Sequence, residues 1–312
     1  MARPLRISYP GAFYHVTSRG NERKAVFKSS GDREKFLEYL STASLRYDAR
    51  VHAYCLMDNH YHLLLQTPSG NLPEIMHHIN GAYTTYFNVK RDRAGHLFQG
   101  RYKAILVEID GYAKELSRYV HLNPVRAKIV HAPEEYPWSS YRDYIGMRRP
   151  LDWLYRDFIL GCFDAEVSKA QDRYRDFVTA LVDQAYASPM EAVLGSALLG
   201  GADFISFIKK NYLSRRKPDK DLPALKQLED RVSVKTICVE VEAAFSGQKR
   251  LARSIQIYLC QKYARRKLKD IGAHFGIRES GVCQAVRRVA ERMKADQRLK
   301  EEIETIEKRF KS

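Results

Sequence analysis

The sequence lacks several features that would place it in common protein classes. Its five cysteines include no CxxC pair, which argues against a disulfide framework and against a cysteine-based zinc site. No apolar run approaches the ~18 residues of a membrane span. The N-terminal residues MARPLRISYPGAFYHV are partly basic but contain neither the apolar core nor the cleavage site of a signal peptide. We therefore expect a cytoplasmic protein with no membrane partner.

Acidic residues are few relative to basic ones, and the excess is unevenly distributed. The 312 residues include 53 Lys and Arg against 37 Asp and Glu, a net charge of +16. Residues 1–150 hold 22 basic and 14 acidic side chains (+8), residues 151–246 hold 13 and 15 (−2), and residues 247–295 hold 13 and 3 (+10). Two basic blocks favour a nucleic acid partner. A basic surface that serves only solubility is the alternative, and phospholipid is a weaker one because no basic amphipathic helix with an aromatic face stands out.

Hydrophobic periodicity and turn residues predict an α+β domain in the first half of the chain. Strands are expected at 13–17, 51–57, 60–66 and 101–109, and helices at 32–47, 73–90 and 111–123. Asp32 is a predicted helix cap, Asp58-Asn59 a predicted turn, and Pro124 the predicted end or kink of the third helix. This order matches the ferredoxin-like plan plus one helix, an antiparallel sheet with helices on one face.

The middle of the chain is less informative. Residues 151–163, 171–186 and 202–213 have helical patterns, and the polar stretch 214–223 with two prolines is typical of a linker. We therefore divide the chain into a first domain at 1–148, a helical connecting region at 149–245 and an all-α domain at 246–312. The residues of the connecting region indicate no chemistry.

Two histidines in the third predicted strand form a candidate metal site. His60 and His62 are two residues apart on the strand, so both side chains point to one face and that of Tyr61 points to the other. Two imidazoles about 6–7 Å apart can chelate one divalent cation. Two ordinary histidines of an amphipathic strand are the alternative, and the absence of a thiol pair argues against a zinc finger.

A tyrosine and an asparagine share one face of the third predicted helix. Tyr119 and Asn123 are spaced i, i+4 in ELSRYVHLNPVRA. A tyrosine can act as a nucleophile, and an amide oxygen suits a Mg²⁺-like ion. Because the chain has 20 tyrosines, this spacing alone does not select Tyr119 over a structural role.

Four segments in order carry a resemblance to a known family. YPGAFYHVTSRGN, DNHYHLLL, LFQGRYKA and YVHLNPVRA together resemble the single-tyrosine HUH transposases, in particular the REP-associated group, over about residues 5–145. The resemblance implies a ferredoxin-like HUH fold, His60 and His62 as ligands of Mg²⁺ or Mn²⁺, and Tyr119 as the catalytic residue. A polar residue four positions later often supplies a third ligand, which implies Asn123 here, although glutamine is commoner at that place.

The resemblance also implies a reaction and a substrate. Tyr119 would attack a DNA phosphate to form a 5′-phosphotyrosine and free a 3′-OH, a reversible cleavage that permits rejoining. The implied substrate is single-stranded DNA with hairpins, for which a basic groove with aromatic side chains is suited. The expected DNA contacts in this domain are Arg19, Arg23, Arg101, Tyr102 and Lys103.

The second basic block predicts a helix-turn-helix. ARSIQIYLCQKYARR has an apolar stripe at Ile255, Leu259 and Tyr263, and LKDIGAHF, a glycine turn and RESGVCQAVRRVAERM follow. A helix pair that packs without binding DNA is the alternative, against which the charge of +10 argues. We expect base contacts from Arg278, Glu279, Ser280, Gln284 and Arg287, and phosphate contacts from Lys269 and Arg288.

This block resembles the DNA-binding domain of the replication initiator DnaA over about residues 248–300. DnaA has an Asp-His-Thr type of motif at the start of its recognition helix, whereas this chain has Arg278-Glu279-Ser280-Gly281. A duplex target other than the DnaA box is therefore expected.

Together these features predict a DNA strand-cleaving and rejoining enzyme with an added duplex-binding module, nucleoid-associated and either a monomer or a homodimer. Two alternatives stay open. One is a rolling-circle replication nickase, which shares the HUH pair and a tyrosine. The other is a non-catalytic DNA-binding regulator that uses the same fold to recognise hairpins.

Overall fold

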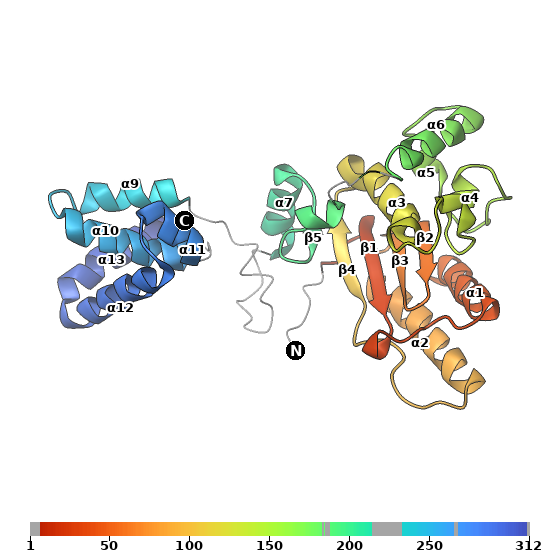
Figure 1. The fold of residues 1–312 in the computed structure, drawn as a ribbon, viewed down its shortest axis with the longest axis horizontal. Coiled ribbons are helices and arrows are strands. Elements are labelled where there is room, and N and C mark those ends of the chain that lie inside the picture. The colour runs from red at the N-terminus through yellow and green to blue at the C-terminus, as the bar shows by residue number, and fades with distance from the viewer. Residues whose placement is uncertain (1–6, 183, 185–187, 214–232, 265–267, 311–312) are drawn as a thin grey trace. The chain divides into compact units, whose positions relative to one another are not determined.

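The computed structural model describes residues 7–182, 184, 188–213, 233–264 and 268–310 (Figure 1). The chain divides into two compact units, Met1–Leu228 and Glu229–Ser312. The predicted linker at 214–223 lies outside the described residues. None of the described helices combines the length and the apolar character that crossing a membrane requires.

A five-stranded sheet lies at the centre of the first unit. Its strands are β1 (Ala12–Arg19), β2 (Arg50–Met57), β3 (His60–Thr67), β4 (Lys103–Val107) and the short β5 (Leu198–Leu199). Their order is β2-β3-β1-β4-β5, in which the first four pair antiparallel and β5 pairs parallel with β4. Helix α1 (Ser30–Tyr47) joins β1 to β2, and α2 (Leu72–Lys90) joins β3 to β4. This is the predicted ferredoxin-like arrangement, extended by one strand.

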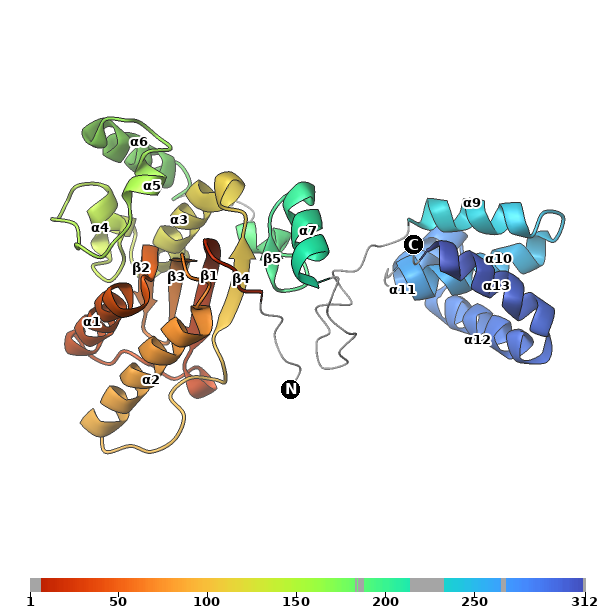
Figure 2. The same ribbon diagram turned by 180° about the vertical axis from the view of Figure 1, so that it is seen from behind.

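Helices cover both faces of the sheet, which corrects the expectation of helices on one face. Helices α1 and α2 cover one face (Figure 2), and Tyr54 and Tyr61 belong to the core cluster on that side. Helix α3 (Ile109–Arg126) packs on the other face, against Cys55 and Leu64. An antiparallel sheet with one solvated face would alternate apolar and polar residues. The sequence of β2, RVHAYCLM, lacks that alternation because the strand is buried along nearly its whole length.

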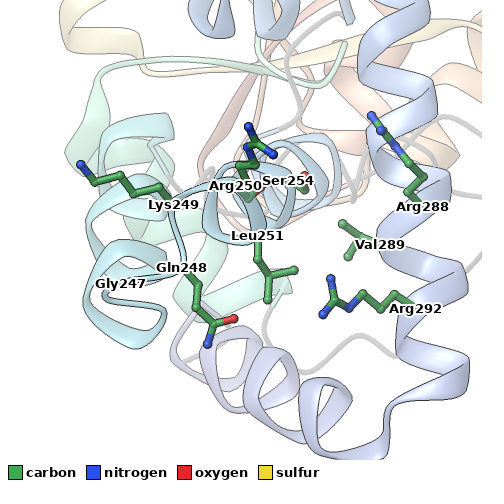
Figure 3. A pocket seen from close by; sticks show the side chains of 9 residues that line it. All are labelled: Gly247, Gln248, Lys249, Arg250, Leu251, Ser254, Arg288, Val289 and Arg292. Carbon is green, nitrogen blue, oxygen red and sulfur yellow. Dashed lines mark hydrogen bonds between the residues drawn. The ribbon is translucent and has the colours of Figure 1, made fainter.

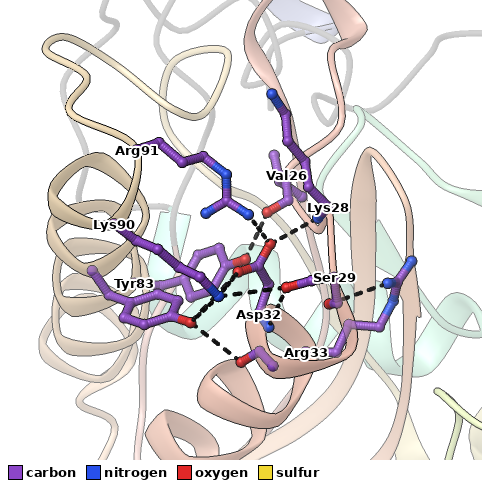
Figure 4. A network of polar contacts seen from close by, with 10 residues as sticks. Val26, Lys28, Ser29, Asp32, Arg33, Tyr83, Lys90 and Arg91 are labelled. Atoms are coloured by element: carbon purple, nitrogen blue, oxygen red, sulfur yellow. Dashed lines mark hydrogen bonds and ion pairs between the residues drawn. The ribbon is translucent and has the colours of Figure 1, made fainter.

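A buried carboxylate joins the start of α1 to the end of α2. The cap of α1 is Ser29, whose side chain accepts a hydrogen bond from the Asp32 N–H, so the predicted cap at Asp32 is wrong. The Asp32 carboxylate instead accepts hydrogen bonds from the Lys28 N–H at 2.8 Å, from Lys90 at 3.0 Å and from Arg91 (Figure 4). Burial alone would raise the pKa of the Asp32 carboxyl, but these donors lower it to about 2.

The described residues 141–213, in the middle of the chain, belong to the first unit. They contribute α4 (Tyr141–Tyr144), α5 (Asp157–Leu160), α6 (Val167–Thr179), α7 (Ala202–Ile208) and the π-helical turn Lys209–Leu213. Short 3-10 turns occur at Asn21–Arg23, Pro133–Glu135 and Pro189–Ala192. Helix α6 packs against α3, where the Tyr174 hydroxyl lies 2.7 Å from His121 Nδ1 and donates to Ser117.

The helix expected at 151–163 is largely wrong, because only Asp157–Leu160 is helical. Leu154 forms a parallel bridge with Val51 at the edge of β2, and the Tyr155 N–H donates to the Val51 carbonyl at 2.9 Å. Pairing with a sheet edge requires extended backbone, so tertiary contacts override the local helical pattern.

The second unit is built from helices. They are α9 (Val234–Ala244), α10 (Lys249–Leu259) with the π-helical turn Cys260–Ala264, α11 (Leu268–Phe275), α12 (Glu279–Ala295) and α13 (Gln297–Arg309). Helices α9 and α13 had no counterpart in the sequence-based prediction. Ile255 and Leu259 of the expected apolar stripe are fully buried, and Tyr263 is half-buried against the same core.

Two glycines shape the turn between α11 and α12. Gly276 has a φ of +63°, a conformation that favours glycine. A Cβ on Gly272 would lie only 2.5 Å from the Ile277 carbonyl oxygen, so the close approach of α11 to the turn requires a residue without one. Phe275 and Val282 are buried on either side of this turn.

Candidate active site

Two histidines project from the start of β3 toward α3. His60 and His62 point to the face that α3 covers, whereas Tyr61 enters the core beneath α1 and α2. The ring centroids of His60 and His62 are 5.0 Å apart. His62 is buried, and His60 is half-buried at the end of the strand. The structure thus brings together the two imidazoles that the HxH spacing singles out.

A third histidine, His15 of β1, lies behind this pair. Its Nε2 is 3.0 Å from Nδ1 of His62, and the two rings stack with centroids 5.2 Å apart. In the β1–β3 register Thr17 is opposite His62, so His15 reaches His62 diagonally across the two strands. The sequence did not indicate His15, because the register of two distant strands cannot be inferred from the residues of either one.

Helix α3 places Tyr119 over the histidines. The Tyr119 ring contacts the rings of His15 and His62 edge-on, with both pairs of centroids 5.8 Å apart. The Arg126 guanidinium, two helical turns later, lies 5.3 Å from the centroid of the same ring. Burial raises the pKa of the Tyr119 hydroxyl, while the positive charge of Arg126 and a hydrogen bond with the Ser188 side chain act in the opposite direction.

Arg126 and Ser188 were both missed in the sequence. Ser188 comes from the connecting region, where it caps the 3-10 turn Pro189–Ala192. Arg126 follows Pro124, where the helix was expected to end or kink, but α3 continues to Arg126 with Pro124 inside it. The i, i+7 spacing of Tyr119 and Arg126 was the one signal that could have identified Arg126.

The histidines have the protonation state that a metal ligand needs. Burial lowers the pKa of His60 to about 4 and that of His62 well below 6.5. Within the described residues, Nε2 of His62 is buried without a hydrogen-bond partner, and Nδ1 of His60 lies 2.6 Å from the Asn59 Oδ1. These two imidazoles therefore fit a divalent cation as nitrogen ligands. No group of three or more His, Cys, Asp or Glu side chains among the described residues is arranged to hold a metal by itself.

Asn123 lies one helical turn after Tyr119 and is half-buried. Its side-chain amide donates to the carbonyl of Tyr119 at 2.8 Å and, more weakly, to that of Val120 at 3.4 Å. Pro124 has no N–H for the Val120 carbonyl four residues earlier, so the Asn123 amide partly replaces that donor. The amide nitrogen thus stabilises the helix around the proline.

Comparison with known proteins relates one segment of the chain to a protein family. Residues 8–123 match the family model described as "Transposase IS200 like". The predicted resemblance to the tyrosine transposases is confirmed over this segment. The matched segment includes His15, His60, His62, Tyr119 and Asn123. The match covers less than half of the chain and none of the second unit.

Among solved structures, a REP-associated tyrosine transposase bound to a REP hairpin is similar to the chain at 15% identity with a TM-score of 0.42. The similarity covers 49% of this chain and 91% of that one. No curated protein matches this chain.

Four of the five DNA contacts predicted in the first unit have exposed side chains. Arg19, Arg23, Arg101 and Lys103 have exposed side chains, whereas Tyr102 is only 7% exposed and packs in the core beneath α2. Arg19 ends β1 opposite His60, and its carbonyl accepts a hydrogen bond from the Gln99 N–H. The loop before β4 is thereby held at the same edge of the sheet as the histidines.

The predicted contacts of the second unit all lie on its surface. Exposed side chains occur at Lys269, Arg278, Glu279, Ser280, Gln284, Arg287 and Arg288. Arg287 Nε forms an ion pair with Glu291 one turn later, at 2.9 Å. An exposed i, i+4 pair contributes little to stability and can be exchanged for another partner.

Proposed function

We propose that the chain is a DNA strand-cleaving and rejoining enzyme that acts on hairpin-forming single strands through Tyr119. The observation that carries this proposal is the convergence of His60, His62 and Tyr119 at one point between β3 and α3. The match of residues 8–123 to a transposase family supports the same activity. Hairpin-forming repeats as the substrate follow from the resemblance to the REP-associated group.

A Mg²⁺ or Mn²⁺ ion would be held by Nε2 of His60 and Nε2 of His62, with the side-chain oxygen of Asn123 as the proposed third ligand. When bound, such an ion withdraws electron density from a phosphate and makes its phosphorus more electrophilic. The orphaned Nε2 of His62 and the low pKa values of both histidines support the first two ligands.

Tyr119 is the proposed nucleophile. Its hydroxyl oxygen attacks the phosphorus and forms a new P–O bond, while the bond from phosphorus to the 3′ oxygen of the preceding nucleotide breaks. The phenol loses its proton and the departing 3′ oxygen gains one, which leaves a 5′-phosphotyrosine and a free 3′-OH. Because one phosphodiester replaces another, attack by a 3′-OH can reverse the step and rejoin strands. Arg126 stabilises the developing phenolate.

We assign His15 a positioning role. When His62 Nδ1 carries the proton and donates it to His15 Nε2, the His62 Nε2 lone pair is free for a metal ion. In the other tautomer His62 Nε2 carries the proton and binds no cation. A hydrogen bond from the second ring nitrogen commonly fixes a metal-binding histidine in this way.

The second unit is proposed to bind duplex DNA through α11 and α12. The three-residue turn, the buried apolar positions around it and the exposed basic residues of α12 support a helix-turn-helix, and the resemblance to DnaA supports the same role. Residues 1–150 supply the other basic surface, which suits the backbone of a single strand.

The proposal is tested with 3′-labelled hairpin-bearing DNA and Mn²⁺ or Mg²⁺, followed by a denaturing protein gel. The wild type should transfer the label to protein, and Tyr119→Phe should abolish transfer. Tyr112→Phe is the matched control, because Tyr112 lies two turns earlier on the same helix and should retain it. Adduct formation by Tyr119→Phe would show that another residue is the nucleophile.

Two further outcomes would favour the alternatives. Hairpin binding without any adduct, on every repeat tested, would favour the non-catalytic regulator. Cleavage of hairpin-free origins in preference to hairpins would favour the rolling-circle nickase.

A further inference from the structure

A groove on the second unit is lined by basic side chains and by no acidic one. It lies between the start of α10 and the second half of α12, and its volume is about 650 Å³. Lys249, Arg250, Arg288 and Arg292 line it together with apolar side chains such as Leu251 (Figure 3). We call the groove that these four cationic side chains line the basic groove.

The cations of the basic groove have no acidic partner within the described residues. Lys249, Arg250 and Arg292 take part in no ion pair there, and Arg288 donates only to the Gln284 carbonyl at 3.4 Å. Four of the other cations of the unit are paired, namely Arg287 with Glu291, Lys262 with Glu307, Arg298 with Glu302 and Arg309 with Glu240. Four like charges around one groove repel one another, which an anionic occupant would relieve.

The basic groove continues the side of α12 that is predicted to face DNA. Gln284, Arg288 and Arg292 are spaced four residues apart and therefore lie along one side of the helix. A rise of about 1.5 Å per residue places the two arginines about 6 and 12 Å beyond Gln284 along the axis. If the first half of α12 contacts bases, the second half and the start of α10 lie beside the backbone that borders them.

We propose that the basic groove binds the phosphate backbone of duplex DNA beside the site contacted by the first half of α12. This inference rests on the proposed duplex binding of the second unit. Guanidinium groups match phosphate oxygens in a bidentate manner, and the apolar lining supports their aliphatic stems. Such contacts contribute to affinity and fix the register but do not depend on base sequence. The basic groove would therefore add the same binding free energy for every duplex sequence.

The test compares two double variants of the full chain that lose the same charge. Arg250→Gln with Arg292→Gln alters the basic groove, and Lys235→Gln with Lys308→Gln is the control at exposed positions of α9 and α13. Binding of a fluorescein-labelled mixed-sequence duplex is followed by anisotropy over a range of KCl concentrations. Excess unlabelled single-stranded DNA occupies the first unit, and circular dichroism confirms that each variant is folded.

Two lost phosphate contacts should reduce the slope of log K against log[KCl] by about 1.8, because each contributes about 0.9. If the electrostatic part of the binding free energy vanishes near 1 M KCl, this difference of about 1.8 in slope corresponds to about 60-fold weaker binding at 0.1 M KCl and about 9-fold weaker binding at 0.3 M KCl. The control should retain the wild-type slope. If the groove variant had the same slope as the wild type, phosphate binding by the basic groove would be refuted, but duplex binding by the second unit would not. An equal loss of duplex affinity in the groove variant and the control would have the same meaning. No duplex binding by the wild type at low salt would refute the proposed function of the second unit as well.

Discussion

Substitution of His15 should weaken metal binding although His15 is not proposed to touch the metal. His15→Ala removes the acceptor 3.0 Å from His62 Nδ1. His15 and His62 are 3% and 6% exposed, so water has little access to replace the lost partner. His62 would then have a buried donor without a partner, or would move its proton to Nε2 and lose the lone pair that binds the cation.

The expected loss follows from that geometry. An unsatisfied buried donor costs about 1–3 kcal/mol, and removal of the hydrogen-bond partner of a metal-binding histidine typically costs about 10- to 100-fold in affinity, or about 1.4–2.8 kcal/mol. We therefore expect Mn²⁺ to bind His15→Ala about 10- to 100-fold more weakly than the wild type. His15→Gln can still accept through its amide oxygen and should recover part of the affinity.

Titration calorimetry with Mn²⁺, in the absence of DNA, measures this effect on the folded chain. His52→Ala is the matched control, since His52 is also a buried histidine of the sheet but pairs with Gln66 on strands β2 and β3. It should lower stability without lowering Mn²⁺ affinity. Wild-type Mn²⁺ affinity in folded His15→Ala would refute the positioning role, and so would an equal loss of affinity in His52→Ala.

Two other substitutions test the packing of each unit. The pKa of Asp32 is lowered from 3.8 to about 2, so its carboxylate contributes about 2 kcal/mol above pH 4 that is lost as the pH falls through 2. Asp32→Asn should remove that pH dependence from urea unfolding curves, whereas the exposed Asp172→Asn should retain it. Gly272→Ala would place a Cβ 2.5 Å from the Ile277 carbonyl and should destabilise the second unit by about 1–3 kcal/mol. Gly281→Ala, whose Cβ has 3.4 Å to its nearest neighbour, should be tolerated in thermal unfolding, and similar effects of both substitutions would contradict this account.

Much of the first sheet could be predicted because its signals are local. The Asp58-Asn59 turn between two runs rich in apolar and aromatic residues placed β2 and β3 to within one residue, and the predicted helices end near the observed ones. Errors arose where a segment's structure depends on a distant partner. Leu154 is extended because it pairs with Val51, and a helical pattern within 151–163 contains no information about that partner.

The candidate site divides in the same way. His60 and His62 follow from the two-residue repeat of one strand, and Tyr119 was selected by resemblance rather than by spacing. His15 and Ser188 reach the site across 47 and about 70 residues of chain, respectively, and only the fold brings them there. Tyr102 shows a different kind of error. It was predicted to contact DNA together with its neighbours Arg101 and Lys103, but its ring is buried whereas their side chains are exposed.

Within the near-neutral region 151–246, the described residues up to 213 are better explained as part of the first unit than as a spacer between two basic blocks. Their strand β5 extends the sheet beside β4, Tyr174 of α6 bonds to His121 of α3, and Ser188 interacts with Tyr119. Residues that pack on the helix of Tyr119 and complete a sheet have little need of positive charge, because they contact protein rather than phosphate. The low net charge of this region is therefore consistent with its structural role around Tyr119. The excess of basic residues lies instead in the two segments for which DNA is the proposed partner.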